Sequence, residues 1–343
     1  MTKDDETSEV LPPAVQLIQM GTASIVSVIV YAAARLGIAD HLAAGPKSAG
    51  ELAGPTGTHA PSLHRLLRSL AGLGILTEKE EQRFALTSLG EALQSGAPGS
   101  ARATLMTFCG PAFWRSWEQI LYSLQTGKPG FEKVFGMPVF EYLAQNPEAA
   151  SAFSETMVGF HGAEPPAVAR AYDFSGIKTL VDVGGATGNM LAAVLCEHPN
   201  LRGVLYDLPH VVSDAPAFLQ ARGVAERVTI EAGNIFERVP SGGDAYLLSH
   251  IIHDWPEEHC VTILGNCRQA MGAEGRLLIV EFVLPPGDAP HPGKVLDIAM
   301  LVLPGGQERT EAEYASLLGK AGLRLNRVVP TESAVSVVEA LRA

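Results

Sequence analysis

The pattern of apolar positions changes in character along the chain, and its first hundred residues predict short helices and a wing. The stretch APSLHRLLRSLAGL, from residue 60 to residue 73, has one helical stripe that consists of Leu63, Leu66, Leu67 and Leu70. The following ILTEKEEQRFALT alternates well enough for two short strands around a charged turn. Helices followed by a two-stranded wing are typical of a winged-helix domain, which we assign to residues 13–98.

A helical and aromatic segment follows over residues 99–171. Its aromatic side chains include Phe113, Trp114, Trp117 and Phe160. Ordinary core packing is the simpler interpretation of any one of them. The alternative is the wall of a pocket for an apolar, aromatic ligand. We therefore treat residues 99–171 as a helical linker and substrate-pocket segment.

From residue 172 to the C-terminus the pattern predicts an α/β domain. Short apolar runs, TLVDV, GVLYD, VTIEA, AYLLS and RLLIVEFV, are separated by helical segments. This alternation is typical of βαβ units, with a parallel sheet covered by helices on both faces. The final LRLNRVVP and AVSVVEAL predict a hairpin that closes the sheet with an antiparallel strand.

Composition and charge narrow the class of protein. The chain has 343 residues, of which 47% are hydrophobic and 18% charged, and its net charge is −12. This composition is globular, and the negative charge disfavours nucleic acid and anionic membranes as partners. A DNA-binding winged helix is the rival interpretation, but residues 1–100 contain seven basic and ten acidic residues. That balance suits a phosphate backbone poorly.

Targeting and membrane signals are weak. The polar, acidic MTKDDETSEVLPP is unlike a signal or transit peptide. Uninterrupted apolar runs fall short of about 18 residues, so we predict no transmembrane helix. Ala23–Ala34 predicts a buried helix, for which a subunit interface is one option. The four cysteines have no CxxC spacing, which favours reduced thiols in a cytoplasmic protein.

Three strand-end loops carry a nucleotide-like pattern. In LVDVGGATGNM the glycine spacing departs from the G-x-G-x-x-G of nicotinamide-binding proteins, and Asp182 suits a ligand with an ammonium group. Asp207 ends the next strand, where a carboxylate can accept hydrogen bonds from a ribose diol. Its alternative role is the N-cap of a helix that begins at Pro209. Residues 233–236, GNIF, would flank an adenine ring. Together the three loops fit S-adenosylmethionine.

These motifs carry a family resemblance. DVGGATG, LYDLPHV, IIHDWPEEHC, GRLLIVE and GGQERTEAEY occur in the order and spacing of a class I methyltransferase family. The chain resembles the plant and bacterial small-molecule O-methyltransferases, which include caffeic acid, hydroxyindole and polyketide-tailoring enzymes. The resemblance implies a Rossmann-like, seven-stranded methyltransferase domain over residues 172–343 and a winged-helix domain that forms a homodimer. It also implies S-adenosylmethionine as methyl donor, no metal, and a small hydroxylated aromatic substrate.

The resemblance also implies site residues. The residues expected around the cofactor are Asp182, Gly184, Gly188, Asp207, Leu208, Gly233, Asn234, Ile235, Phe236, Ser249 and Trp255. Those expected around the methyl acceptor are Trp114, Met157, Phe160, His161, Asp297 and Met300. Three positions depart from the family pattern: Asn234 stands for an aspartate, Ser249 for a lysine or arginine, and His161 for a serine.

His253 in the H-D-W motif maps onto the family's general base. A phenol titrates near pH ~10, whereas a histidine with a pKa of ~6.5 is neutral and available at pH 7. Glu281 and Glu308 match the family's flanking glutamates, which we expect to orient the imidazole. We expect Asp254 to cap the helix that begins at Pro256.

Two alternatives to this assignment remain. His250 and His253 could bind a metal, but they straddle a strand–helix junction and no further ligand cluster is visible in the sequence nearby. We therefore predict no metal. A C- or N-methyltransferase, or a relative that has lost methyl transfer, would share the same fold. The complete set of His253, Glu281 and Glu308 argues against the last of these.

Overall fold

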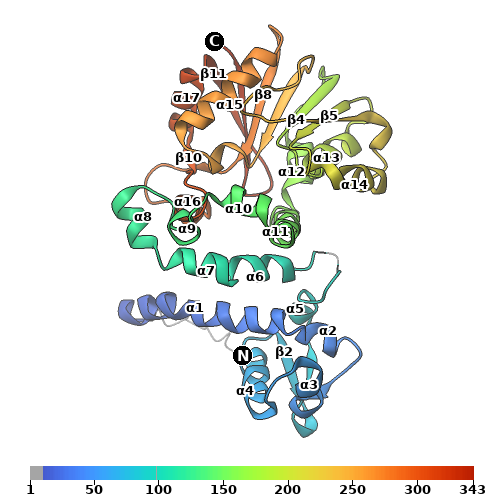
Figure 1. The fold of residues 1–343 in the computed structure, drawn as a ribbon, viewed down its shortest axis with the longest axis vertical. Helices are drawn as coiled ribbons and strands as arrows, with labels where there is room; N and C mark the ends of the chain where they lie inside the picture. Colours follow the sequence, from blue (N-terminus) through green and yellow to red (C-terminus); the bar gives the residue numbers. More distant parts are fainter. Residues whose placement is uncertain (1–10, 98) are drawn as a thin grey trace, which may run out of the picture. The chain divides into compact units, whose positions relative to one another are not determined.

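The structure, a computed structural model, describes residues 11–97 and 99–343. The chain divides into two compact units (Figure 1). The first contains the described residues up to 114 together with 148–160, and the second contains 115–147 and 161–343. The segment that we predicted as one linker, residues 99–171, is thus shared between both units.

The first unit is mainly helical and carries a small antiparallel sheet. Leu63, Leu67 and Leu70 are buried on the predicted stripe, and they pack with Phe84 of the wing in one apolar core. The sheet has the order β1-β3-β2, in which β2 and β3 form the predicted wing. The elements are α1 (Pro13–Arg35), α2 (Ile38–Leu42), β1 (Lys47–Ser48), α3 (Ala49–Thr56), α4 (Ala60–Gly72), β2 (Leu76–Lys79), β3 (Arg83–Leu86), α5 (Ser88–Glu91), α6 (Arg102–Phe108) and α11 (Pro147–Phe160).

The apolar helix α1 differs from its sequence prediction. We expected Ala23–Ala34 to be buried, but within the single chain only Ala33 and Ala34 of α1 are buried. Ile25, Val26 and Val28, which lie within that range, are 60%, 41% and 46% exposed. Over its 23 residues α1 is long and apolar enough to cross a membrane by length and composition alone, although polar residues interrupt it. Its amphipathic pattern is weak, so the sequence does not indicate which surface covers it.

The second unit is built on a seven-stranded sheet, as predicted. The strand order is β11-β12-β8-β7-β4-β5-β6, in which β12 is antiparallel to β8 and β11 to β12, and all other pairs are parallel. The strands are β4 (Thr179–Val183), β5 (Arg202–Asp207), β6 (Val228–Ala232), β7 (Ala245–Ser249), β8 (Arg276–Glu281), β11 (Leu323–Pro330) and β12 (Ser336–Arg342). Two short strands, β9 (Val283–Leu284) and β10 (Arg309–Thr310), pair with each other outside this sheet.

Helices cover both faces of the large sheet (Figure 1). Alternate strand residues face two separate cores, because successive side chains of a strand point to opposite sides. Leu180 and Leu205 pack on the face covered by α12, α13 and α14, whereas Val181 and Tyr206 pack on the face of α15 and α17. The helices are α12 (Glu164–Ala171), α13 (Asn189–Glu197), α14 (Ala215–Ala221), α15 (Glu257–Ala270), α16 (Gly293–Val302) and α17 (Glu311–Lys320).

The helices that remain come from the aromatic segment. They are α7 (Pro111–Trp117), α8 (Ile120–Thr126), α9 (Gly130–Phe135) and α10 (Val139–Gln145). Short 3₁₀ turns include η2 (Val212–Asp214) and η4 (Ile252–Asp254). The order of the sheet matters for function, because β8, β7, β4 and β5 are neighbours and their carboxyl ends bring the predicted motifs to one edge.

Candidate active site

The glycine turn after β4 is shaped by close approach. Gly184 and Gly188 have φ of 73° and 87°, in the left-handed region that favours glycine. A Cβ on Gly184 would lie 2.5 Å from Ile251 Cδ1, and one on Gly185 would lie 2.5 Å from the carboxyl group of Asp182. Only glycine fits these positions without displacement. Ala186 shares the left-handed conformation, with φ of 50°.

Asp207 is bound to this turn. Its Oδ2 accepts a hydrogen bond of 2.9 Å from the Ala186 amide, and its Oδ1 accepts one of 2.7 Å from the Leu208 amide. Burial raises the pKa of Asp207, and these two amides oppose the rise. The alternative role as a helix N-cap is wrong, because the next helical turn begins only at Val212. Each carboxylate oxygen keeps a second lone pair for a further donor.

Asp182 lies beneath the turn and is fully buried. Among the described residues, its carboxylate oxygens have no hydrogen-bond partner of normal geometry. Burial and the negative charge of Asp207 raise the pKa of Asp182 to about 7, and the Leu191 amide opposes this only in part. A buried carboxyl group without partners is costly, so this position favours a positively charged neighbour.

The loop after β6 holds the predicted adenine-side residues. A Cβ on Gly233 would lie 2.2 Å from the Tyr206 hydroxyl, so this position also requires glycine. Asn234 Oδ1 accepts a hydrogen bond of 3.0 Å from the Phe236 amide, which fixes the direction of the side-chain amide. The Ile235 carbonyl accepts one of 2.9 Å from Asn266 Nδ2. Leu208 is 39% exposed and Ser249 is half-buried at the end of β7.

Trp255 belongs to an aromatic cluster in the second unit. Its ring stacks on Phe140 at 5.2 Å between centroids and meets Phe236 edge-on at 4.8 Å. The predicted cap beside it is wrong: Pro256 is the N-cap of α15, and no side-chain cap bond from Asp254 is present there. Asp254 instead lies inside η4, where its Oδ1 is 3.7 Å from His253 Nε2.

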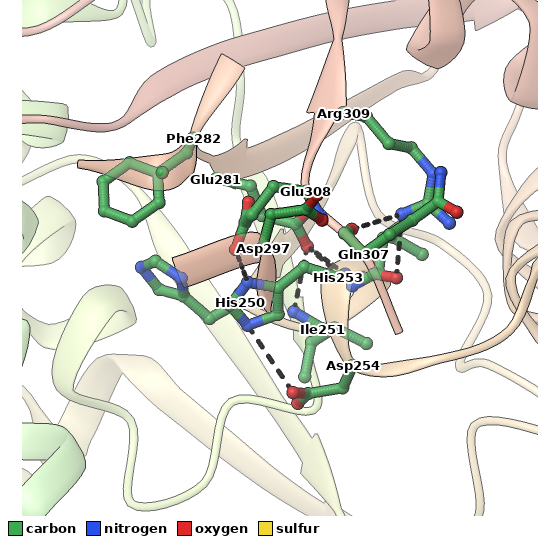
Figure 2. A network of polar contacts seen from close by, with 12 residues as sticks. His250, Ile251, His253, Asp254, Glu281, Phe282, Asp297, Gln307, Glu308 and Arg309 are labelled. Carbon is green, nitrogen blue, oxygen red and sulfur yellow. Dashed lines mark hydrogen bonds and ion pairs between the residues drawn. The ribbon is translucent and has the colours of Figure 1, made fainter. Parts of the chain in front are cut away.

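His253 lies between two carboxylates, as Figure 2 shows. Its Nδ1 is 2.6 Å from Glu308 Oε1, and Asp254 lies on the side of Nε2. His253 is 5% exposed and Glu308 is 3% exposed. The Glu308 amide donates a hydrogen bond of 2.8 Å to Asp297 Oδ1, so Asp297 fixes the loop that carries Glu308.

Glu281 supports the backbone of this turn. Its Oε1 accepts hydrogen bonds from the amides of Ile251, Ile252 and His253 at 3.1, 2.6 and 3.2 Å. Its Oε2 accepts one of 2.6 Å from the buried Tyr314 hydroxyl. We expected Glu281 to orient the imidazole, but its hydrogen bonds go to the backbone that carries the ring.

The charges around His253 change its titration. Burial lowers the pKa of His253, but Asp254, Glu308 and Glu281 together outweigh it and raise the pKa to about 10. Burial, opposed by His253, raises the pKa of Asp254 to about 7. The expectation of a histidine neutral at pH 7 is therefore wrong for the protein without ligands.

A second histidine–carboxylate cluster lies beside this one. Glu164 Oε2 is 2.6 Å from His250 Nε2 and 3.0 Å from His161 Nδ1. The centroids of the two imidazole rings are 3.8 Å apart. Burial opposes ionisation of Glu164, but the two histidines outweigh it and lower the pKa to about 2. Burial and His161 lower the pKa of His250 to about 3, against the pull of Glu164. The His250 backbone is left-handed, with φ of 53°.

The predicted acceptor residues are divided between the units. Trp114, Met157 and Phe160 belong to the first unit, and His161, Asp297 and Met300 to the second. Within the first unit Phe160 meets Phe108 edge-on at 5.4 Å and is 45% exposed. Met300 contributes its carbonyl to a hydrogen bond of 2.8 Å from the Gly305 amide.

Sequence reasoning missed three residues that organise the site. Tyr314 and Arg309 follow Glu308 in the chain, and the buried Arg309 guanidinium donates to the Ile252 carbonyl at 3.2 Å. Glu164 is the third. An acid three residues after His161, directly before two prolines that can begin a helix, was the available signal for it.

Comparison with known proteins establishes the family. Residues 117–324 match the O-methyltransferase domain family, and residues 18–96 match the O-methyltransferase dimerisation domain family. The phenazine O-methyltransferase PhzM of Lysobacter antibioticus is 45% identical over 340 residues, which is 99% of each chain. The phenazine-1-carboxylate N-methyltransferase of Pseudomonas aeruginosa is 35% identical over 338 residues, which is 97% of this chain and 98% of that one.

Solved structures agree with this match. The crystal structure of LaPhzM is similar with a TM-score of 0.93 and 45% identity, over 97% of this chain and 100% of that chain. The O-methyltransferase NcsB1 from neocarzinostatin biosynthesis, in complex with S-adenosylmethionine and 2-hydroxy-5-methyl naphthoic acid, has a TM-score of 0.81 and 33% identity. That match covers 93% of this chain and 96% of the other.

The chain therefore belongs to the O-methyltransferase family of bacterial natural-product biosynthesis, and it carries that family's dimerisation domain. It is an S-adenosylmethionine-dependent O-methyltransferase with a Rossmann-like catalytic domain. These findings confirm the resemblance and the fold class predicted from the motifs. They favour dimerisation over DNA binding as the role of the winged-helix domain.

Proposed function

We propose that this enzyme methylates a hydroxyl group of a small aromatic natural product and that His253 is the general base. The observation that carries the proposal is the 2.6 Å contact between His253 Nδ1 and Glu308 Oε1 at the carboxyl edge of the sheet. It fixes Nδ1, so that Nε2, whose contact with Asp254 Oδ1 is longer at 3.7 Å, can take a proton from the acceptor.

The residues present fit S-adenosylmethionine. The glycine turn would lie under the methionine part, because a left-handed strand-to-helix turn that lacks side chains at Gly184 and Gly188 lets a ligand approach the backbone closely. Asp207 would accept hydrogen bonds from the ribose diol, and Asn234 and Ile235 would flank the adenine ring. The unpartnered carboxyl group of Asp182 suits the positive charge of an ammonium group.

The chain's own groups supply alignment and proton transfer. When bound, S-adenosylmethionine offers a methyl group on a positively charged sulfur, which is already activated for displacement. His253 Nε2 takes the acceptor's hydroxyl proton, and Glu308 stabilises the imidazolium that results. Glu281 and Tyr314 hold the backbone of the loop, so that His253 stays in one position.

The raised pKa of His253 sets a condition on this role. A base must be unprotonated, and with a pKa of about 10 the imidazole holds a proton at neutral pH in the protein without ligands. A cation bound nearby disfavours the imidazolium and lowers its pKa. We therefore expect the rate to rise with pH above neutrality rather than near ~6–7, which is the expectation from an unperturbed histidine.

The acceptor is proposed from the lining residues and the relatives. Trp114, Met157 and Phe160 would contact a flat, apolar molecule, and His161, Asp297 and Met300 would contribute polar and apolar contacts to it. PhzM is named for a phenazine, and NcsB1 was solved with a naphthoic acid, so both relatives handle fused or carboxylated aromatic rings. A phenazine or naphthoate with a free hydroxyl is the proposed substrate class.

The proposed assembly is a homodimer in the cytoplasm. The dimerisation domain family covers residues 18–96, and this range includes most of α1. The exposed apolar side chains of α1, among them Leu17, Ile18 and Met20, would be covered by a second copy of the chain. Such a dimer requires neither nucleic acid nor a membrane as partner.

The test is a methylation assay with the purified chain. S-adenosylmethionine would be supplied with hydroxylated phenazines, naphthoates and simple phenols, and with aromatic amines as the matched N-acceptors. Mass spectrometry detects the added methyl group, and NMR locates it on oxygen, nitrogen or carbon. We expect O-methylation, with His253→Ala slowing turnover by ~10²–10⁴-fold while S-adenosylhomocysteine affinity is nearly unchanged.

His59→Ala is the control, because His59 is exposed and lies in the first unit. It should keep full turnover. Exclusive methylation of the amines would reject the proposed acceptor. Wild-type turnover of a neutral phenol by His253→Ala would reject the proposed base.

A further inference from the structure

In contrast to the sequence prediction of no metal, we propose that His161, Glu164 and His250 form a binding site for a divalent transition metal ion. Their ligand atoms, one from each residue, all lie within 4.8 Å of one another. Two imidazole nitrogens and one carboxylate oxygen are the donors that zinc takes in sites with an open fourth position. The same donor types also bind other divalent transition metals.

The three donors come from two elements that the fold brings together. His161 and Glu164 stand three residues apart at the start of α12, where the Glu164 amide donates a hydrogen bond of 3.0 Å to the His161 carbonyl. His250 follows the central strand β7, 86 residues away in the chain from Glu164. All three residues belong to the second unit, so the site needs no contribution from the first.

The distances allow a metal after a small movement. Ligand atoms at about 2.0–2.2 Å from a tetrahedral zinc ion are about 3.3–3.5 Å apart. Glu164 Oε2 now lies 2.6 Å from His250 Nε2 and 3.0 Å from His161 Nδ1. A shift of the Glu164 carboxylate away from the two imidazole nitrogens, by a few tenths of an ångström to somewhat under an ångström, would make room for an ion between the three donors.

The cluster is largely buried, but each of its side chains keeps a small exposed fraction. The side chains of His161, Glu164 and His250 keep 14%, 9% and 11% of their exposure. His250 has a left-handed backbone, which is uncommon for a residue other than glycine and is found preferentially at functional sites. His253 does not belong to this group of three ligand residues, and its Nδ1 is bound to Glu308.

Metal binding is measured directly on the full chain. The protein would be stripped with a chelator, dialysed against Zn²⁺, and analysed for bound metal by mass spectrometry. Co²⁺ would serve as a spectroscopic probe, since its visible bands distinguish a four-coordinate site from the hydrated ion. We expect one tightly held Zn²⁺ per chain and a Co²⁺ spectrum of low coordination number that Zn²⁺ displaces.

Matched variants locate the ion. Glu164→Gln keeps the shape but removes the charged ligand, and His250→Asn places at this position a residue that tolerates a left-handed backbone. Each should weaken Zn²⁺ by more than the ~10–100-fold cost of losing an outer contact. Cys196→Ser and His59→Ala, two exposed positions in the second and first unit, are the controls and should bind as the wild type does.

Three results would overturn the proposal. They are a stripped wild-type chain that takes up no Zn²⁺, a Co²⁺ spectrum of the hydrated ion, and Zn²⁺ affinity that survives both Glu164→Gln and His250→Asn. If a variant fails to fold, the wild-type Co²⁺ spectrum still decides the case. These measurements do not depend on methyl transfer, so they stand apart from the test of the proposed base.

Discussion

Replacing Glu308 by glutamine should lower the pKa of His253 without moving the ring. The Glu308 side chain is buried, and its Oε1 lies 2.6 Å from His253 Nδ1. Glutamine has the same shape, and its amide oxygen can still accept the Nδ1–H hydrogen bond. The variant therefore removes the negative charge and keeps the orientation, which separates the two effects that this glutamate has on the imidazole.

The size of the shift follows from the hydrogen bond. A buried hydrogen bond to a charged group contributes about 1.5–3 kcal/mol, and one pKa unit corresponds to about 1.4 kcal/mol. Loss of the charge should therefore lower the pKa of His253 by about 1–2 units from its value of about 10. Asp254 and Glu281 remain, so the pKa should stay above that of a free histidine.

The assay has two independent readouts. An NMR titration of the His253 ring in the protein without ligands gives its pKa directly, and the pH profile of kcat/KM shows where the rising limb lies. Both midpoints should move to lower pH in Glu308→Gln, and the plateau rate should fall. Glu311→Gln, at an exposed position three residues further along the chain, is the matched control. Unchanged midpoints in Glu308→Gln would refute the idea that this carboxylate sets the protonation of His253.

Further changes test the cofactor loop, the loop support, the titration and the interface. Asp207→Asn should weaken S-adenosylhomocysteine at least tenfold in calorimetry, and unchanged affinity would remove Asp207 from the site. Tyr314→Phe should reduce turnover and have little effect on cofactor affinity. It should also lower the free energy of unfolding, measured in denaturant titrations, by about 1–3 kcal/mol. Wild-type turnover in this variant would argue against a positioning role for Tyr314. His253 has a raised folded pKa, so its stabilisation is complete below its unfolded pKa and is lost as pH rises through about 10. The midpoint temperature of thermal unfolding should therefore fall more steeply above pH 7 in wild type than in His253→Gln. An equal fall with pH in both proteins would contradict the raised pKa. Ile18→Lys with Met20→Lys should yield monomers in light scattering, and a persistent dimer would place the interface elsewhere.

The sheet and its cofactor loops were predictable because they leave local signals. Strands buried on both faces give continuous apolar runs, and glycines mark the turn after β4 wherever a Cβ would collide with a neighbour. Asp207 was found because it ends a strand. Its bond to the Ala186 amide was not visible, since the two residues meet only when β4 and β5 pair.

The remaining features depend on contacts between distant residues. The pKa of His253 is raised by Asp254, its neighbour in the chain, and by Glu308 and Glu281, which arrive from the loop before β10 and from β8; sequence spacing does not give the distances of the last two. Glu164 joins His250 across 86 residues. The cap assigned to Asp254 failed because the chain makes a 3₁₀ turn before Pro256, so its carboxylate faces the imidazole instead. Exposure of α1 depends on a partner surface that a single sequence does not contain.

The bond between Asp207 and the Ala186 amide has a consequence for how a ligand would be received. Ala186 has a left-handed backbone, which costs a non-glycine residue about 1–2 kcal/mol. Asp207 offsets this cost because its carboxylate accepts a hydrogen bond of 2.9 Å from the Ala186 amide. Folding itself therefore arranges the loop. A ligand diol that reaches Asp207 would then meet a preorganised surface and would lose little affinity to ordering the chain. Because one carboxylate would both shape the loop and bind the ligand, substitution of Asp207 should slow association as well as speed dissociation.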